Sequence, residues 1–273
     1  MVTTELHIRR REGWEALHIR EIWAHRELLY FFVWRDVKIR YKQTLLGGLW
    51  AILQPLLGAI VFAGVLQRVG LSGVPGIPFV LFTYTGLMLW TFFANAVSMA
   101  GNSMVANEQL VRKVYFPRVL IPLASVAAFV LDLAISVVFL ALMMLFYHWP
   151  ATSMIFLAPL FVLATFFTAS GLGMILAALN VQFRDVKYVI PFLLQIGLFV
   201  TPVFYPLTHA SGVLRLLLSL NPVAGLMEGW RAALLGTPIL WPVVLGASLA
   251  SVVLFVAGLF FLQRRERVFA DLI

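Results

Sequence analysis

The polar residues of this chain that could do chemistry lie in short patches between long apolar stretches. The first patch, 107–118, begins with Asn107 and Glu108 and is closed by Pro117 and Arg118. Asn is a favourable N-cap, acids suit the first helical turn, bases suit the last turn, and proline ends a helix. We therefore expect a short, capped surface helix that ends at Pro117. Its apolar and aromatic side chains, carried beside charges, are suited to binding a partner protein.

The expected docking residues of this patch are Asn107, Glu108, Leu110, Arg112, Lys113, Tyr115 and Phe116. A simple helical connector lying on lipid headgroups is the alternative reading. The second patch is a tight turn after an apolar stretch, with Phe183, Arg184 and Asp185 in sequence. Adjacent Arg and Asp in such a turn often only pair with each other. Together with the first patch, however, this turn predicts one polar face that could receive a partner.

The segment 23–42 has aromatic and basic residues at different positions around a helix. Trp34 and Tyr41 recur at helical spacing with other apolar residues, and the charged residues fall largely on the remaining positions. A helix of this kind lies in the plane of the membrane interface. An ordinary anchor next to the membrane is the alternative. The basic residues that could bind an acidic headgroup are Arg35, Lys38, Arg40 and Lys42.

Asp132 is the one acidic residue deep inside an apolar stretch. A carboxylate within a membrane span is a functional candidate by default. Ser125 and Ser136 fall on nearly the same helical face, so a hydrogen-bonded Asp132 that joins two helices is an equal alternative. Glu228 and Arg231 are three residues apart and could form a stabilising ion pair on one helical face.

The sequence carries no recognisable catalytic or metal-binding motif. No phosphate-binding P-loop is present, so ATP is not expected to bind this chain in that way. The five histidines are scattered, and there is no cysteine to form a disulfide or a thiolate. We therefore expect no catalytic residues, no metal ligands and no cofactor bound by this chain.

Composition explains which elements must carry these patches. Of 273 residues 62% are hydrophobic, well above the share of about half in soluble domains. The net charge of +8 does not indicate nucleic-acid binding, because the basic residues flank apolar stretches. The sequence predicts an all-α integral membrane protein, a single domain over 1–273, with six membrane-spanning helices. They are expected at 45–67, 79–105, 119–147, 153–181, 188–204 and 239–262.

The remaining segments are assigned by their polarity and helix breakers. Residues 1–43 form the interface segment, 44–262 the bundle and 263–273 a tail. Between the fifth and last spans, Pro206 and Asn221–Pro222 interrupt apolar sequence and predict two short re-entrant helices, with Asn221 as an N-cap. A seventh span is the alternative. In the six-span arrangement 17 basic residues lie on one side and three on the other, which places both termini in the cytoplasm.

A subset of the aromatic residues could line a pathway through the bundle, because stacked rings offer a surface for sugars. The candidates are Phe82, Tyr84, Trp90, Phe92, Phe93, Phe199, Phe204 and Tyr205. Ala169, Gly173 and Ala177 form a stripe of small residues that predicts close helix packing.

These features, in this order, resemble the membrane subunit of type-2 ABC exporters for polysaccharides such as O-antigen, capsule and teichoic acid. The resemblance is carried by 34–42, the Leu-Gly-Gly-Leu-Trp sequence at 46–50, Gln54-Pro55, the 107–117 loop and Phe-Arg-Asp-Val at 183–186, followed by Thr201-Pro202 and Asn221-Pro222. It covers nearly the whole chain from about residue 25.

The resemblance implies a homodimer of this chain bound to two copies of a separate nucleotide-binding subunit that holds ATP and Mg²⁺. The 107–116 helix would be the coupling helix in a cleft of that subunit. The substrate would be a polysaccharide linked to a polyprenyl diphosphate in a bacterial plasma membrane, with the diphosphate engaging the basic interface helix. Export of drugs or small lipids is the nearest alternative, and a membrane-embedded enzyme that processes glycolipids is a more distant one.

Overall fold

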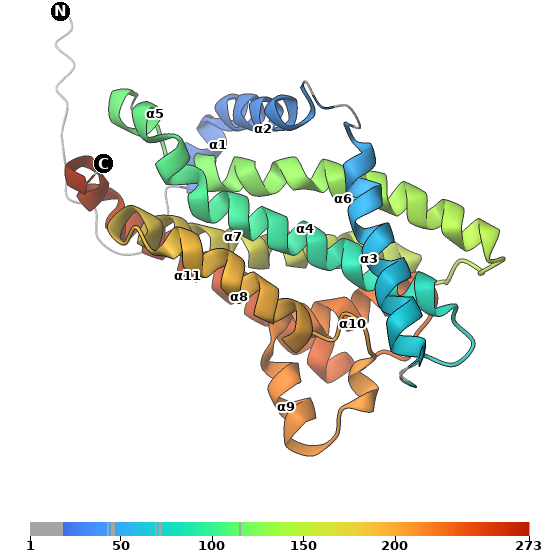
Figure 1. The fold of residues 1–273 in the computed structure, drawn as a ribbon. Helices are drawn as coiled ribbons and strands as arrows, with labels where there is room; N and C mark the ends of the chain where they lie inside the picture. Colours follow the sequence, from blue (N-terminus) through green and yellow to red (C-terminus); the bar gives the residue numbers. More distant parts are fainter. Residues whose placement is uncertain are drawn as a thin grey trace, which may run out of the picture.

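The computed structural model describes residues 19–42, 44, 47–68, 70, 73–114 and 116–272, with side chains except at 19–20 and 267–272. Tyr115, Leu45 and residues 1–18 of the predicted interface segment lie outside the described residues. Where the chain is described, it is built from helices joined by short turns, with no strand (Figure 1). The prediction of an all-α fold is therefore confirmed.

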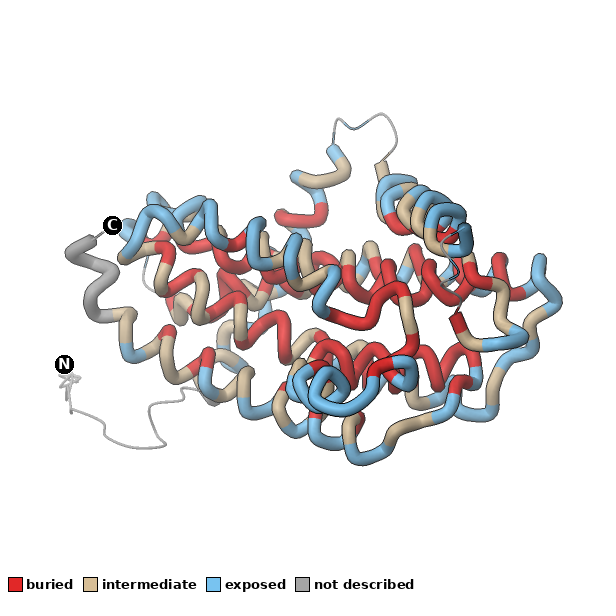
Figure 2. The backbone as a smooth tube through the Cα atoms, turned by 60° about the horizontal axis from the view of Figure 1, so that its bottom comes forward, coloured by how far each residue is buried: buried red, intermediate tan, exposed pale blue. Residues whose placement is uncertain are grey.

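Helix α4 (Phe79–Ala106) is the centre of the bundle. It packs against α3 (Leu49–Arg68), α6 (Leu120–Phe146) and α7 (Ala158–Gln182), and more lightly against α8 (Val186–Val200) and α10 (Pro222–Leu235). Apolar residues occur all around its surface, which is the pattern of a helix buried on every side. Figure 2 shows the buried residues gathered on the inner helices and the exposed residues on the outer ones.

Five of the described helices are long and apolar enough to cross a membrane. They are α3, α4, α6, the 3-10 turn Ile155–Leu157 with α7, and the Trp241–Glu266 part of α11 (Trp241–Leu272). Helix α8 has 15 residues, so it rises about 22 Å, less than the hydrocarbon thickness of about 30 Å. The integral membrane class is supported, whereas the count of six spans stays a prediction.

Residues 263–272 of the predicted tail are helical. Helix α11 continues without a break to Leu272, past the apolar stretch that was expected to end at residue 262. The sequence after Leu262 is charged but contains neither glycine nor proline, so nothing interrupts the helical hydrogen bonding. The segments before α11 are short: α9 (Gly212–Leu220) and α10 follow a 3-10 turn at Leu207–His209. Asn221 accepts a hydrogen bond from the Val223 amide at 3.0 Å, as predicted for the N-cap of α10.

Small residues let α7 approach two neighbours closely. A Cβ added to Gly173 would lie 2.5 Å from the Ala100 Cβ of α4. A Cβ added to Gly171 would lie 2.4 Å from the backbone oxygen of Leu254 in α11. The predicted close-packing stripe is confirmed, since Ala169 and Ala177 are also fully buried.

Gly171→Ala should separate α7 from α11, because its added methyl group would meet backbone atoms that cannot rotate away. We expect the free energy of unfolding to fall by about 1–3 kcal/mol, measured by thermal or denaturant unfolding of the purified protein. Gly246→Ala, in the same helix pair, is the matched control, because a Cβ there meets nothing within 4 Å. It should leave stability unchanged or raise it, and equal losses in both variants would contradict this packing.

Candidate functional site

One side of helix α2 (Arg26–Tyr41) is held by an aromatic contact to the turn before α6 and by two polar contacts to α6 itself. Phe32 packs edge-on against Phe116, with ring centroids 5.5 Å apart. One turn later, the Asp36 carboxylate accepts a hydrogen bond from Ser125 Oγ at 3.3 Å. Another turn later, Arg40 Nη1 lies 2.6 Å from Asp132 Oδ2. Three residues of α2, each four apart, therefore contact the turn before α6 and the first half of α6.

Asp132 is the centre of this contact. Tyr41 Oη donates a hydrogen bond to Asp132 Oδ1, and the Arg40 guanidinium lies 3.5 Å from the centre of the Phe129 ring. Burial, followed by the bond to Asp132, raises the pKa of Tyr41 well above its ordinary value, so the phenol stays a donor. Neither of the predicted serine neighbours bonds the Asp132 carboxylate. Ser125 Oγ donates to Asp36, and Ser136 Oγ lies 2.8 Å from the Ala51 carbonyl oxygen and 3.0 Å from the backbone carbonyl oxygen of Asp132. Asp132 thus joins two helices, one of the two roles considered for it.

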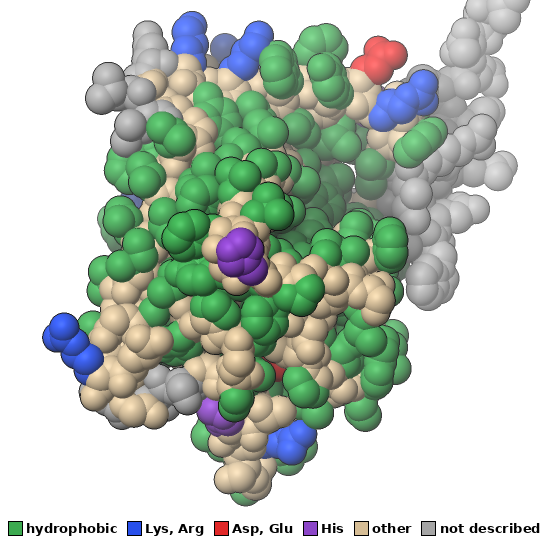
Figure 3. All heavy atoms as spheres, turned by 90° about the vertical axis from the view of Figure 1, so that its right-hand side faces the viewer, with side chains coloured by type: hydrophobic (Ala, Val, Ile, Leu, Met, Phe, Trp, Pro, Cys, Tyr) green, Lys and Arg blue, Asp and Glu red, His purple; other side chains and the backbone are tan. Residues whose placement is uncertain are grey.

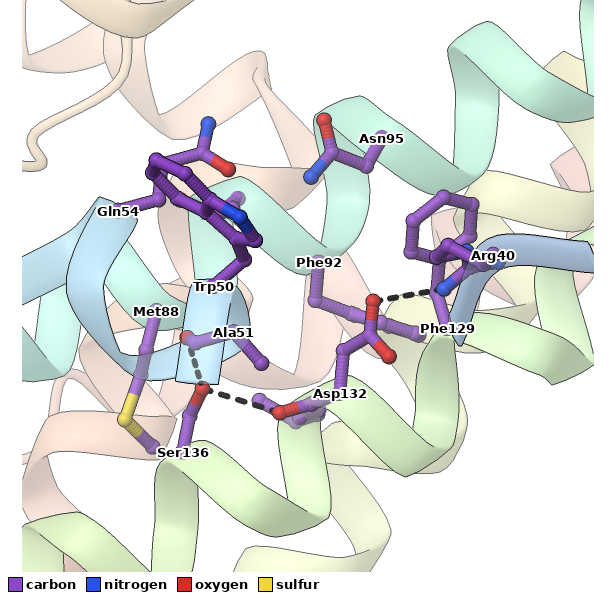
Figure 4. Close-up of a pocket in the computed structure, with 12 residues that line it drawn as sticks. Arg40, Trp50, Ala51, Gln54, Met88, Phe92, Asn95, Phe129, Asp132 and Ser136 are labelled. Atoms are coloured by element: carbon purple, nitrogen blue, oxygen red, sulfur yellow. Dashed lines mark hydrogen bonds and ion pairs between the residues drawn. The ribbon is translucent and has the colours of Figure 1, made fainter. Parts of the chain in front are cut away.

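A cavity of 140 Å³ opens beside Asp132, where α2, α3, α4 and α6 meet (Figure 4). Arg40 comes from α2, Trp50 and Gln54 from α3, Asn95 from α4 and Asp132 from α6. The amides of Gln54 and Asn95 form no hydrogen bond with any described residue, and Arg40 Nη2 is buried without a partner there. The described residues that line the cavity are Arg40, Trp50, Ala51, Gln54, Met88, Thr91, Phe92, Asn95, Phe129, Asp132, Leu133 and Ser136.

Sequence reasoning missed most of this lining. Single amides such as Gln54 and Asn95 in apolar helices gave no recognisable spacing with each other or with Asp132. Their chemistry could have identified them, because placing an amide in hydrocarbon without a hydrogen-bond partner costs roughly several kcal/mol of free energy. Such residues must face protein, water or a polar ligand.

The structure separates the four basic candidates on the interface helix. Arg35 Nη2 lies 2.8 Å from Asp36, and Arg40 is paired with Asp132. Lys38 and Lys42 are exposed and form no ion pair within the described residues, although Lys38 Nζ lies 5.4 Å from the Trp34 ring centre. Only the two lysines therefore present uncompensated charge.

The two polar patches lie at the same end of the bundle. Asn180 Nδ2, near the end of α7, donates to the Gly101 carbonyl, near the end of α4, at 3.0 Å. Helix α5 (Glu108–Lys113) begins directly after the end of α4, and Phe183 directly follows α7. Both polar patches therefore begin just beyond this hydrogen bond. In Figure 1, α5 and the C-terminus lie at this end. The opposite end, in Figure 3, is covered mostly by hydrophobic side chains, with few charges.

The first patch differs from its prediction in three ways. Helix α5 ends at Lys113, before Pro117, because Val114 is extended and the chain turns into the core. The Asn107 side chain does not cap α5, since its Nδ2 donates to the Ser103 carbonyl at the end of α4. Phe116 was expected to be exposed, but it is 4% exposed and packs against Phe32.

The exposed part of this end consists of few side chains. Glu108 and Arg112 form an ion pair of 3.0 Å on one exposed face of α5, and Lys113 is also exposed. Leu110 is half-buried and Val114 is 52% exposed. In the second patch, Phe183, Arg184 and Asp185 are all exposed. These residues are available for contact, and Phe116 is not.

The aromatic candidates also divide by burial. Phe82, Tyr84, Trp90, Phe92, Phe93 and Phe204 are at most 7% exposed, and the first five of these lie on the central helix α4. Neighbouring helices bury Phe82, Tyr84, Trp90 and Phe93 within the bundle, and the expectation that they line a pathway stays a prediction. Phe92 touches the cavity, and Phe204 packs on Phe62 with ring centroids 4.2 Å apart. Phe199 is 59% exposed and Tyr205 half-buried, so these two can face a path.

Glu228 and Arg231 do not bind each other as predicted. No ion pair within 4 Å joins them among the described residues, although both are buried. Arg231 donates to the Pro202 carbonyl at 2.7 Å and to the Val203 carbonyl, and its guanidinium lies 3.9 Å from the Phe82 ring centre. Glu228 Oε1 accepts from the Leu207 amide at 2.7 Å. Both side chains hold the irregular segment after α8, whose backbone groups lack helical partners.

Comparison with known proteins identifies the family. The model of the family "ABC-2 type transporter" matches residues 27–235. The chain is 33% identical to the O-antigen export system permease protein RfbA of Myxococcus xanthus, over 91% of this chain and 96% of the relative. It is 26% identical to a Klebsiella pneumoniae protein of that name, over 90% and 95% of the two chains. It is 26% identical to the polysialic acid transport protein KpsM of Escherichia coli, over 74% and 78%.

The family match includes the interface helix, both polar patches and the segment held by Arg231, as the earlier resemblance implied. The chain therefore belongs to the ABC-2 type transporter family of membrane proteins.

Proposed function

We propose that this chain is the membrane-spanning permease of an ATP-driven exporter of lipid-linked polysaccharide. The observation that carries the proposal is its similarity, over nine-tenths of its length, to proteins named O-antigen export permeases. The chain supplies the path and is not itself an enzyme. A separate ABC ATPase subunit binds ATP and Mg²⁺ and drives transport.

The assembly consists of two copies of this chain and two copies of the ATPase. The end of the bundle with α5 and the Phe183–Asp185 turn faces the ATPase in the cytoplasm. This orientation is supported by the 17 basic residues on that side against three on the other, in a bacterial plasma membrane. ATP binding and hydrolysis move the docking surface, and the permease changes state because the ATPase contacts the two states differently.

The substrate is carried on a polyprenyl diphosphate lipid. Lys38 and Lys42 are the residues of the interface helix that support binding of its diphosphate, because their charges are exposed and uncompensated. Arg35 and Arg40 are weaker candidates, since each already pairs with a carboxylate. Phe199 and Tyr205 remain the predicted aromatic contacts of the moving glycan.

Deletion of this gene in its native bacterium should remove the exported polysaccharide from the cell surface and leave polymer inside the cell. Re-expression of the chain with its ATPase should restore export, measured by surface labelling and by the cellular pool of lipid-linked polymer. Normal surface polymer in the deletion strain, or transport by the chain alone in vesicles with no ATPase, would contradict the proposal.

Val114→Asp should abolish co-purification of the ATPase while leaving the permease folded. Val114 is exposed beside α5, so the carboxylate costs the permease little but would be buried without a partner in a protein interface. The retained fraction of ATPase in a pull-down should fall at least about tenfold, as expected for a loss of a few kcal/mol of binding energy. Val114→Thr, which keeps the shape, is the matched control and should retain the complex.

Phe116→Asp is not a suitable test, because Phe116 is part of the core. Normal co-purification of Val114→Asp would remove this residue from the interface.

A further inference from the structure

The cavity beside Asp132 contains charged groups but has no net formal charge. Among the described residues of its lining, Arg40 and Asp132 are the only Lys, Arg, Asp or Glu residues, and they lie 2.6 Å apart. An anion that entered would have to compete with Asp132 for Arg40 while being repelled by the carboxylate. The cavity is therefore poorly suited to a diphosphate and better suited to a neutral polar molecule.

Several hydrogen-bonding groups of the lining are unused. The amides of Gln54 and Asn95 each offer donors and an acceptor, and neither bonds a described residue. Arg40 Nη2 adds a buried donor without a protein partner. Figure 4 shows Gln54 and Asn95 with Trp50 on the side of the cavity above Asp132. Mixed donors and acceptors of this kind match the hydroxyl groups of a sugar, each of which both donates and accepts.

The remaining wall is apolar and of suitable size. Trp50 is 55% exposed and presents its indole ring, and Phe129 lines the cavity with its ring centre 3.5 Å from the Arg40 guanidinium. The C–H face of a sugar ring packs on such aromatic surfaces. The volume of 140 Å³ is close to that of cavities of about 150 Å³ that hold one six-membered ring.

We propose that the cavity between α2, α3, α4 and α6 is a binding site for one neutral sugar ring of the exported glycan, an assignment that rests on the proposed function. Gln54, Asn95 and Arg40 hydrogen-bond the hydroxyl groups, and Trp50 packs on the ring. Because Arg40 of α2 lines one side of the cavity, an occupied site also contacts the helix that carries Lys38 and ends next to Lys42, the two residues proposed to bind the lipid carrier.

The test uses the full chain, purified in a detergent without a sugar headgroup and placed in lipid nanodiscs. The probes are the methyl α-D-pyranosides of glucose, mannose and galactose, detected by saturation-transfer difference NMR. At least one of them should bind wild type, and inorganic diphosphate should not displace it. The double variant Gln54→Ala/Asn95→Ala should bind about tenfold more weakly, as expected for loss of two hydrogen bonds.

Two matched controls test the position of the site. Gln67→Ala removes the same type of amide from the other end of α3, and Trp241→Ala removes an exposed indole from α11; neither residue lines the cavity. Both should bind like wild type, whereas Trp50→Ala should bind more weakly. Gln54, Trp50 and both control residues are exposed, so these variants should fold, as thermal unfolding of each will check.

Binding of no probe, equal binding by the double variant and wild type, or displacement of the glycoside by diphosphate would each overturn the sugar site. Export by the wild-type complex in cells without glycoside binding in nanodiscs overturns the cavity assignment alone. Failure of re-expression to restore export overturns the proposed function, whatever the NMR result.

Discussion

Arg231→Met should abolish polysaccharide export and lower the free energy of unfolding by about 3–5 kcal/mol. The Arg231 side chain is fully buried and donates to the carbonyls of Pro202 and Val203. Methionine fills the space but donates nothing, so both carbonyls are left buried without a donor. The segment that carries Phe204 and Tyr205 then loses its support from α10.

The measurements for Arg231→Met are thermal unfolding of the purified chain and surface polymer in complemented cells. Arg231→Lys is the informative comparison, because one ammonium group cannot reproduce the fork of the guanidinium toward two carbonyls. We expect an intermediate loss of stability and of export. Trp230 is adjacent and equally buried, and its indole donates to the Thr85 carbonyl at 3.1 Å. Trp230→Phe therefore shows the effect of losing one buried hydrogen bond, for comparison with the loss of both Arg231 hydrogen bonds. Wild-type export by Arg231→Met would show that the support is unnecessary.

Asp132→Ala should release α2 from α6, because the Arg40 guanidinium and the Tyr41 hydroxyl lose their shared acceptor. The side chains of Arg40 and Asp132 are 23% and 20% exposed, so water screens the pair only partly. Breaking a buried pair costs about 3–5 kcal/mol, and with this exposure we expect the lower part of that range, measured by thermal unfolding. Export should also fall, because α2 positions the residues proposed to bind the lipid carrier.

The double variant Arg40→Met/Asp132→Leu should recover part of this stability, since it removes the unpaired charge together with its partner. Glu108→Ala is the matched control: it breaks the exposed Glu108–Arg112 pair, whose side chains are 47% and 56% exposed. Its effect should be within about 0.5 kcal/mol. Equal effects of Asp132→Ala and Glu108→Ala would mean that the α2–α6 contact contributes little.

Several parts of this description could be predicted from local sequence. Hydrophobic length located the starts of five long helices to within a few residues. Hydrocarbon offers no hydrogen-bond partner to a peptide group, so a long apolar segment in a membrane must form a helix that pairs its own backbone groups. The N-cap at Asn221 was predictable, since the capping bond joins residues two apart. Helix packing through Ala169 and Gly173 was predictable because a stripe of small residues permits close approach.

Predictions about the partners of individual side chains were less successful. Glu228 and Arg231 have the spacing of an ion pair, but each binds backbone groups of the segment after α8. Asn107 has the position of an N-cap, but it bonds back to Ser103. In both cases a nearby unsatisfied backbone group provided a better partner, and its position depends on how the helices end.

The sequence by itself determined that this is a helical membrane protein with polar patches between its spans, because length, hydropathy and capping are local properties of the chain. Only the tertiary structure decided which charges remain available. It paired Arg40 with Asp132, 92 residues away, buried Phe116 against Phe32, and brought Gln54 and Asn95 to one cavity. The physical reason is that burial and pairing depend on distances between helices, which helical periodicity along one segment does not contain.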